Sequence, residues 1–257
     1  MQEALVVVVA LVAAGITFFS GFGLGTVLLP VFALFFPAHV AVAATAIVHL
    51  LNNGLKVGLL RAHIDRRVVL RFGVPAVIAA PVGALALDRL ADVRALATYT
   101  LGGRAFEVHT LNLVLASLLI AAGLQELVPR LGRVSFGPGI MPIGGVASGF
   151  VGGLAGLQGA LRSAFLIRAG LGRDGFIATG VAVGLMVDVG RVSVYGANGT
   201  LAEPGSGYGL ILAAVAGAAA GTLIAHRALK KVTVGWIRTI VGVLLVAVAL
   251  ALGVGLV

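Results

Sequence analysis

The chain has 257 residues, of which 60% are hydrophobic and only 11% are charged. Soluble globular domains carry about 25% charged residues, so this composition excludes that class and indicates a polytopic membrane protein. The net charge of +9 does not indicate a nucleic-acid-binding surface, because the basic residues cluster in short loops, where they determine membrane topology. Cysteine is absent, which excludes disulfides, thiolate chemistry and cysteine metal sites.

The first half of the chain predicts five apolar helical segments. They cover about 4–19, 26–36, 39–60, 69–87 and 111–127. The first follows Met1-Gln2-Glu3, without the basic region of a signal peptide, and is expected to be a retained membrane segment. The second would extend roughly 17 Å as a helix, less than the roughly 30 Å of a hydrocarbon core. Pro75 and Pro81 predict kinks in the fourth, and we expect the mixed-charge connection from Asp88 to His109 to form an interfacial helix.

The second half repeats this order. Its apolar segments cover about 140–154, 160–169, 174–195, 208–225 and 237–257. Glycine-rich interruptions at 20–25 and 152–159 occupy equivalent places, with Gly21 and Gly156 at an offset of 135. The loop 61–67 is strongly basic and its counterpart 196–204 has no basic residue, so the positive-inside rule puts them on opposite sides of the membrane.

These patterns predict an all-α polytopic membrane protein built from two inverted-topology repeats, with broken or re-entrant half-helices at the glycine-rich motifs. Residues 1–133 would form the first transmembrane repeat and residues 134–257 the second, inverted one, within one integral membrane domain. Both termini would lie outside. The alternative is a chance match between two segments rich in glycine and alanine.

The residues of both halves resemble the TauE/SafE family of sulfite and organosulfonate exporters. The first half matches the family's first block through Gly21-Phe22-Gly23-Leu24-Gly25, Pro30 and Ala41-Val42-Ala43-Ala44-Thr45. The second half matches its second copy through Gly153, Gly156, Gly159, Gly170 and Ala178-Thr179, and the departures from the family pattern are Leu24, Gln158, Ala160 and Phe165. The resemblance implies secondary transport of sulfite, sulfoacetate or another organosulfonate across a bacterial-type inner membrane by alternating access.

The glycine breaks independently predict an anion site. Short helices that start after Gly25 and after Gly159 would present unpaired amide donors and positive dipole ends to a bound oxyanion. Thr26, Gln158 and Arg162 would add a hydroxyl, an amide and a bidentate guanidinium, and Ser163 is adjacent. The alternatives are close helix packing for the glycines and snorkelling to an interface for Arg162.

The long segments 39–60 and 174–195 carry the other polar groups expected at membrane depth. His49, Asn52, Asn53 and Lys56 follow i, i+3, i+4, i+7 spacing and share one helical face. Asp188 and Arg191 are expected to form a structural salt bridge, or else Asp188 or His49 carries a proton coupled to the anion. Thr45 and Thr179 occupy matching positions, where they line the cavity or bond back to their own helices.

The predicted substrate-binding residues are therefore Gly23, Gly25, Thr26, Thr45, His49, Asn52, Gln158, Gly159, Arg162, Ser163 and Thr179. Lys56, Asp188 and Arg191 have possible coupling or salt-bridge roles. We expect no cofactor, no metal site, no catalytic residues and no nucleic-acid partner. The expected partners are a small anionic substrate, membrane lipid and two open alternatives, a coupling proton and a second copy of the chain.

Three other functions are alternatives: a transporter or channel for another solute, an intramembrane enzyme, and a membrane scaffold or channel component, of which a plain scaffold is disfavoured by the inverted repeat. A transporter or channel for another solute, such as a carboxylate or a metal cation, would fit the same architecture. A cation site is less favoured because Asp188 is the only carboxylate expected inside the membrane. An intramembrane enzyme would need a nucleophile–base pair or a metal motif, and nucleotide-driven pumping would need a P-loop; the sequence has neither.

Overall fold

The computed structural model describes residues 2–20, 23–128, 130–131, 134–202, 207–228 and 235–256. The main helices are α1 (Gln2–Ser20), α2 (Leu24–Ala33), α3 (Ala38–Leu60), α5 (Val74–Ala91), α6 (Thr110–Leu127), α7 (Met141–Ala155), α8 (Gln158–Leu166), α9 (Arg173–Ala197), α10 (Tyr208–Ala228) and α11 (Gly235–Gly253). Within the described residues, 6 helical stretches are long and apolar enough to cross a membrane. The prediction of an all-α polytopic membrane protein is confirmed.

The connection between α5 and α6 is a β-hairpin, so the expectation of an interfacial helix there was wrong. Strands β1 (Ala97–Leu101) and β2 (Arg104–Val108) pair antiparallel, with Tyr99 opposite Phe106. Two glycines form the turn at φ 59° and 79°, the left-handed conformation that two-residue hairpin turns require. Short runs of β-branched and aromatic residues on both sides of a Gly-Gly pair favour this hairpin over a helix.

The start of the fourth segment shows how the helix accommodates proline. A short helix α4 (Arg66–Val68) leads into a π-helical turn, η2 (Val69–Gly73), which continues as α5. Pro75 lies in the first turn of α5 and Pro81 lies inside it. Because proline has no amide donor and crowds the preceding turn, a widened turn directly before it relieves the clash.

The central pair of the bundle is α3 and α9. These two helices contact each other and bury the largest shares of their length among the 6 candidate spans. Three other pairs pack around them, namely α1 with α10, α5 with α7, and α6 with α11. The short helices α2 and α8 contact α3 and α9, respectively, so both lie against the central pair.

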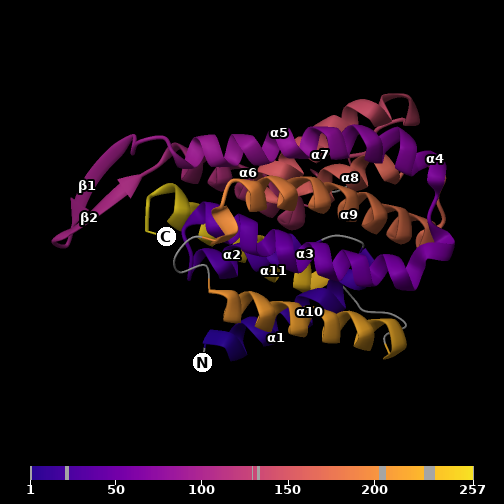
Figure 1. Cartoon of the computed structure of the whole chain (residues 1–257), viewed down its shortest axis with the longest axis horizontal. Helices are drawn as coiled ribbons and strands as arrows, with labels where there is room; N and C mark the ends of the chain where they lie inside the picture. Colours follow the sequence, from indigo (N-terminus) through magenta and orange to yellow (C-terminus); the bar gives the residue numbers. More distant parts are fainter. Residues whose placement is uncertain are drawn as a thin grey trace.

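The two ends of the bundle differ in composition. Both termini and the hairpin lie at one end and α4 lies at the other (Figure 1). The α4 end carries the basic turn η1 (Arg61–His63) followed by Arg66 and Arg67. At the hairpin end, Asp88 accepts hydrogen bonds from Asn198 and from Thr200, which lie just beyond α9. The loops 61–67 and 196–204 are therefore at opposite ends, although residues 203–206 lie outside the described part of the chain.

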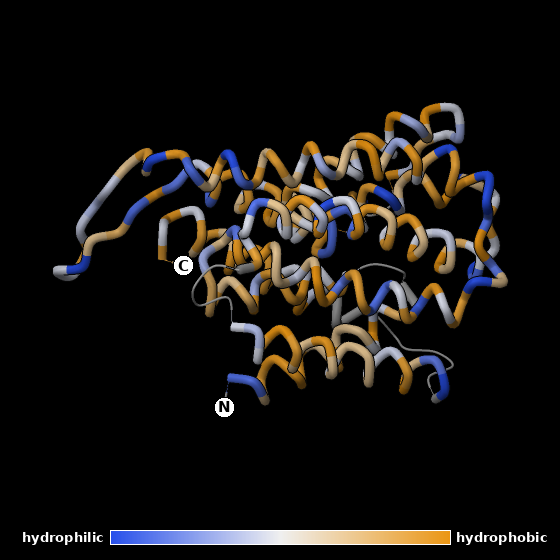
Figure 2. The backbone as a smooth tube through the Cα atoms, viewed as in Figure 1, coloured by the Kyte–Doolittle hydropathy of each residue, from blue (hydrophilic) through white to orange (hydrophobic). Residues whose placement is uncertain are grey.

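The surface along the helices is apolar. Figure 2 shows hydrophobic residues along the length of the helices and hydrophilic residues gathered near α4 and in the hairpin. Many large aliphatic side chains are exposed there, among them Ile78, Ile143, Leu212 and Leu250. Exposed aliphatic side chains over the middle of a long bundle are the surface that a lipid hydrocarbon core solvates.

Glycine allows two of the helix pairs to pack with their backbones in contact. On α7, Gly145, Gly149 and Gly153 face α5, and a Cβ on Gly149 would lie 2.0 Å from the carbonyl oxygen of Ala76. On α10, a Cβ on Gly221 would lie 2.0 Å from the carbonyl oxygen of Leu11 in α1. This is the small-residue packing common between membrane helices, and it accounts for these glycines without a role in binding.

Replacing Gly149 by Ala should therefore destabilise the protein. The added methyl group overlaps the α5 backbone, and overpacking of this kind costs about 1–3 kcal/mol. The measurement is thermal unfolding in detergent. The matched control is Gly54→Ala in α3, where no atom lies within 4 Å of the new Cβ. Equal melting temperatures for the two variants would contradict the packing argument.

Topology reporters should also distinguish the two ends. A reporter at Arg66 is expected in the cytoplasm, because this end carries the basic turn. Reporters at Asn198 and in the hairpin turn at Gly102 are expected outside, because both lie at the opposite end. Accessibility labelling in intact cells measures this. The same side for Arg66 and Asn198 would refute the arrangement.

Candidate functional site

Each glycine-rich motif contains one glycine that interrupts a pair of helices. Gly23 precedes α2 with φ 113°, and Gly156 follows α7 with φ 73°. Both values lie in the left-handed region, which glycine adopts without the steric cost that other residues meet. Gly21 and Phe22, also part of the first motif, lie outside the described residues.

The short helices begin slightly earlier than predicted. Helix α2 begins at Leu24 and α8 at Gln158, so Gly25 and Gly159 lie within their first turns and not before them. The reason is conformational, since Gly23 and Gly156 already supply the left-handed residues that break the chain. Residues of both first turns, Gly25 and Thr26 of α2 and Gln158 and Gly159 of α8, still line the cavity where the two breaks meet.

The two breaks are in contact. A Cβ on Gly25 would lie 3.2 Å from the carbonyl oxygen of Gly156 and 3.7 Å from Cδ2 of His49. Between them is a closed cavity of about 10 Å³, measured as the space open to the centre of a water molecule, which is about enough for one water. Its lining residues are Gly23, Gly25, Thr26, His49, Gly156, Gln158, Gly159 and Arg162. The structure therefore brings together residues that the sequence placed in separate halves.

Arg162 and Gln158 supply the polar wall of the cavity. Arg162 is only 3% exposed, and its Nη1 donates a hydrogen bond of 3.3 Å to Oε1 of Gln158. Nε2 of Gln158 is buried and has no hydrogen-bond partner among the described residues. Space for the guanidinium is provided by Gly184 in α9, where a Cβ would lie 3.0 Å from Nη1 of Arg162. Across the cavity, the hydroxyl of Thr26 donates to the carbonyl of Gly23 at 2.6 Å.

Asp188 is the centre of a buried network behind the cavity. Its Oδ2 accepts hydrogen bonds from Nδ1 of His49 at 2.8 Å and from Nδ2 of Asn53 at 2.7 Å. Its Oδ1 accepts from Nε and Nη2 of Arg191 at 3.0 and 2.7 Å. The carboxylate is fully buried and joins α3 to α9. The i, i+3 salt bridge between Asp188 and Arg191 is therefore present, and His49 belongs to the same network.

Arg191 also touches the second break. A Cβ on Gly156 would lie 2.7 Å from Nη1 of Arg191, a buried nitrogen with no hydrogen-bond partner among the described residues. Next to it, Tyr195 in α9 donates its hydroxyl to the carbonyl of Gly153 in the last turn of α7. Asn53, Gly156 and Tyr195 were missing from the predicted site. Asn53 and Tyr195 had a signal, because each lies four residues after His49 or Arg191 and so on the same helical face.

The other predicted residues do not line the cavity. Asn52 accepts a hydrogen bond from Thr222 in α10 at 2.7 Å. Thr45 donates to the carbonyl of Ala41, which is the back-bonding alternative. Thr179 accepts from the backbone N–H of Asp65 and so ties α9 to the basic turn. Nζ of Lys56 is 5.7 Å from the ring centroid of Phe18, a cation–π contact.

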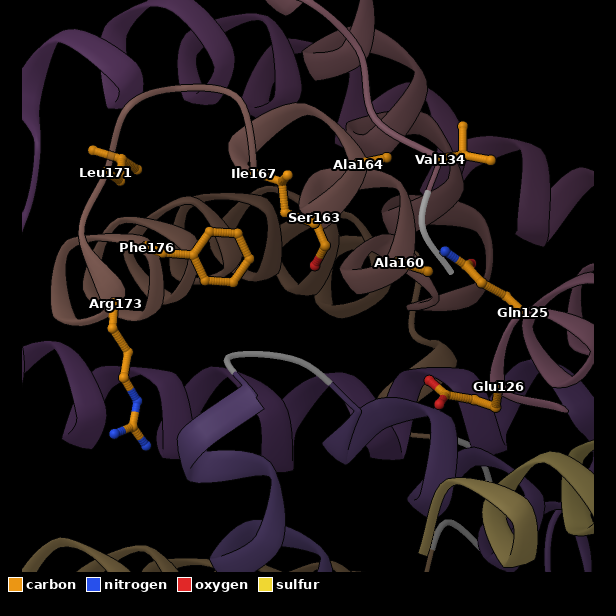
Figure 3. A pocket seen from close by; sticks show the side chains of 10 residues that line it. All are labelled: Gln125, Glu126, Val134, Ala160, Ser163, Ala164, Ile167, Leu171, Arg173 and Phe176. Atoms are coloured by element: carbon orange, nitrogen blue, oxygen red, sulfur yellow. The ribbon is translucent and has the colours of Figure 1, made fainter. Parts of the chain in front are cut away.

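Ser163 lies on the opposite face of α8. Its hydroxyl donates to the carbonyl of Gly159 at 2.8 Å, and its side chain lines a separate pocket of about 420 Å³. Figure 3 shows Ser163 near Phe176 in this pocket, with Arg173 and Glu126 at opposite sides of the view. One short helix, α8, therefore separates the closed cavity from a larger pocket formed with α6 and α9.

The charges buried inside the bundle are mostly positive. Among the described residues, three cationic side chains are buried, Lys56, Arg162 and Arg191, against one carboxylate, Asp188. Asp188 pairs with Arg191, and buried cationic side chains outnumber buried carboxylates within this set. A protein interior with surplus positive charge favours an anion over a cation.

Fold and site together define a polytopic α-helical membrane protein with a polar, positively charged site enclosed between two helix breaks. Residues 6–252 match the sequence model of the family described as sulfite exporter TauE/SafE. The match covers nearly the whole chain, and the chain belongs to this family of membrane transporters. None of the curated proteins or solved structures compared with the chain matches it.

The buried network should be essential to stability. Replacing Asp188 by Asn leaves Arg191 buried beside a neutral amide, and breaking a buried ion pair in this way costs about 3–5 kcal/mol. Thermal unfolding in detergent measures the loss. The control is Asp92→Asn, the same change at an exposed position, which is expected to shift stability by less than about 0.5 kcal/mol. Comparable stabilities for the two variants would show that the network contributes little.

Proposed function

We propose that this protein is a secondary transporter that moves a small oxyanion, such as sulfite, sulfoacetate or another organosulfonate, across the bacterial inner membrane. The observation that carries the proposal is the small cavity between the two helix breaks, which is lined by the buried guanidinium of Arg162 and by Gln158, whose Nε2 has no hydrogen-bond partner among the described residues. A guanidinium in a low-dielectric interior attracts an anion strongly. A bound oxyanion would lie beside Arg162 and could accept hydrogen bonds from it and from Gln158.

The backbone supports the same ligand. Helices α2 and α8 both direct their N-termini toward the cavity, and the first amide groups of a helix have no partner within it. Each helix also carries about half a positive charge at that end, which favours an anion. The unpartnered Nε2 of Gln158 adds a neutral donor suited to an oxyanion oxygen.

The arrangement of helices supports two inverted repeats, residues 1–133 and 134–257, as the basis of alternating access. Suppose that α1, α3, α5 and α6 of the first half are equivalent to α7, α9, α10 and α11 of the second. Replacing each helix by its equivalent then turns the α1–α10 contact into the α7–α5 contact, which is also observed. The same replacement leaves the α3–α9 and α6–α11 contacts unchanged, as a two-fold relation between the halves requires. A closed cavity of about 10 Å³ between the halves is then the occluded state, and α2 and α8 are half-helices that approach it from the two halves.

Anion binding should depend strongly on Arg162. We expect Arg162→Ala to weaken sulfoacetate binding at least about tenfold, because a charge-assisted contact to a buried anion is lost. Isothermal titration calorimetry on the purified protein measures this. The matched control is Arg168→Ala, an exposed arginine just beyond the end of the same helix, which should bind normally.

The same titration separates the competing functions. Sulfite, sulfoacetate, acetate and a divalent cation are each titrated into the unaltered protein. Binding of the cation without any of the anions would overturn the proposal. Preference for acetate would retain anion transport but replace the substrate class by carboxylates. Equal affinity for the Arg162 and Arg168 variants would remove Arg162 from the site.

A further inference from the structure

We propose that anion binding is coupled to one proton, and that the proton is held on Nε2 of His49 while Asp188 stays ionised. This inference rests on the proposed function, because it assigns a second ligand to the same site. It follows from three features of the structure: the hydrogen bonds that occupy both oxygens of Asp188, the orientation of the His49 ring, and the charged groups near that ring.

Asp188 is not the group that takes up the proton. Its two oxygens accept four hydrogen bonds, two from Arg191, one from Asn53 and one from His49. Every one of these partners donates, so both carboxylate oxygens act only as acceptors. A proton on either oxygen would point at a group that also donates, and the hydrogen bond to that group would be lost. Protonation would also leave the buried guanidinium of Arg191 beside a neutral acid. Asp188 therefore acts as a fixed negative charge that positions its neighbours.

His49 has one nitrogen fixed and one nitrogen turned to the cavity. Nδ1 lies 2.8 Å from Oδ2 of Asp188, which only accepts, and 3.0 Å from Nδ2 of Asn53, which already donates to the same oxygen at 2.7 Å; we therefore assign the proton of the neutral ring to Nδ1. Nε2 then carries a lone pair. This atom would lie 3.8 Å from a Cβ on Gly25, and His49 lines the cavity, so Nε2 faces the first break. When Nε2 gains a proton, the ring acquires a second donor at the point where an anion would sit.

The charges around His49 make its protonation depend on the anion. Arg162 on α8 and Arg191 on α9 are positive, Asp188 on α9 is negative, and the amine of Lys56, two turns further along α3, lies over the ring of Phe18. Helix α2, Leu24–Ala33, has no titratable side chain, and on α10 His226 lies against Phe18, with 5.8 Å between the rings. A further positive charge on Nε2 of His49 is unfavourable beside the guanidinium of Arg162, which lines the same cavity. A bound anion offsets the repulsion, so anion and proton each raise the affinity for the other.

Calorimetry with methanesulfonate tests the coupling, because this strong acid does not titrate between about pH 5 and 8, where histidine does. Titrations are repeated in buffers of different ionisation enthalpy, and the slope of the observed enthalpy gives the number of protons taken up. We expect the slope to approach one proton per anion at the alkaline end of this range. The affinity should fall by up to about tenfold per pH unit there. His49→Gln should abolish the slope, and His63→Gln, at an exposed position in η1, should keep it.

Each outcome decides between the two proposals. Clear binding with no proton uptake by the unaltered protein, or uptake that persists in His49→Gln, overturns the coupling and leaves the anion site intact. No binding of any anion overturns the proposed function as well. If His49→Gln does not fold, ¹⁵N spectra of labelled histidine in the unaltered protein decide. Adding methanesulfonate should move one buried Nε2 signal from the unprotonated to the protonated position, and an unchanged spectrum contradicts the proposal.

Discussion

The hydrogen bonds and the ion pair of the Asp188 carboxylate are the interactions on which the packing of the interior depends. The carboxylate joins the two central helices, because its partners His49 and Asn53 belong to α3 while Arg191 belongs to α9. Inside the bundle, the same carboxylate balances the charge of Arg191 and accepts or shares the hydrogen bond that orients the ring of His49. Arg191 in turn packs against Gly156, so the geometry of the second break is set by the same network. One buried carboxylate therefore links helix packing to the shape of the cavity.

Glycine has two separate roles in this bundle, and the difference lies in backbone geometry. Gly149 and Gly221 are helical, and they let α7 approach α5 and α10 approach α1 so closely that carbonyl oxygens fill the space of a Cβ. Gly23 and Gly156 are left-handed, and they end or begin helices inside the bundle. Small-residue packing explains the first pair fully. The second pair meets at the cavity, where the broken helices leave amide groups available to a ligand.

Much of this could be predicted from the sequence, because apolar length, glycine breaks and helical periodicity are local signals. They placed the membrane helices and put His49, Asn53 and Lys56 on one face. The hairpin was missed because its weak strand signal lies in a mixed-charge connection. Which pocket the Ser163 side chain lines depends on the orientation of α8 about its own axis, and the hydrogen bond from Asn53 to Asp188 depends on that of α9. Such rotation is fixed by contacts between halves 135 residues apart, which local patterns do not encode.

The two breaks contribute different chemistry to one cavity, and this bears on where selectivity arises. The first offers backbone amides and the hydroxyl of Thr26, which already donates its hydrogen bond to the carbonyl of Gly23 and can still accept one. The second offers Gln158 and Arg162 on α8, with Arg191 behind Gly156. Backbone amides recognise any small oxyanion, whereas a guanidinium and an amide at fixed positions favour particular oxygen geometries. Because α8 also lies between the cavity and the pocket beside Ser163, the proposed alternating access would open that side by a movement of the helix that carries Gln158 and Arg162.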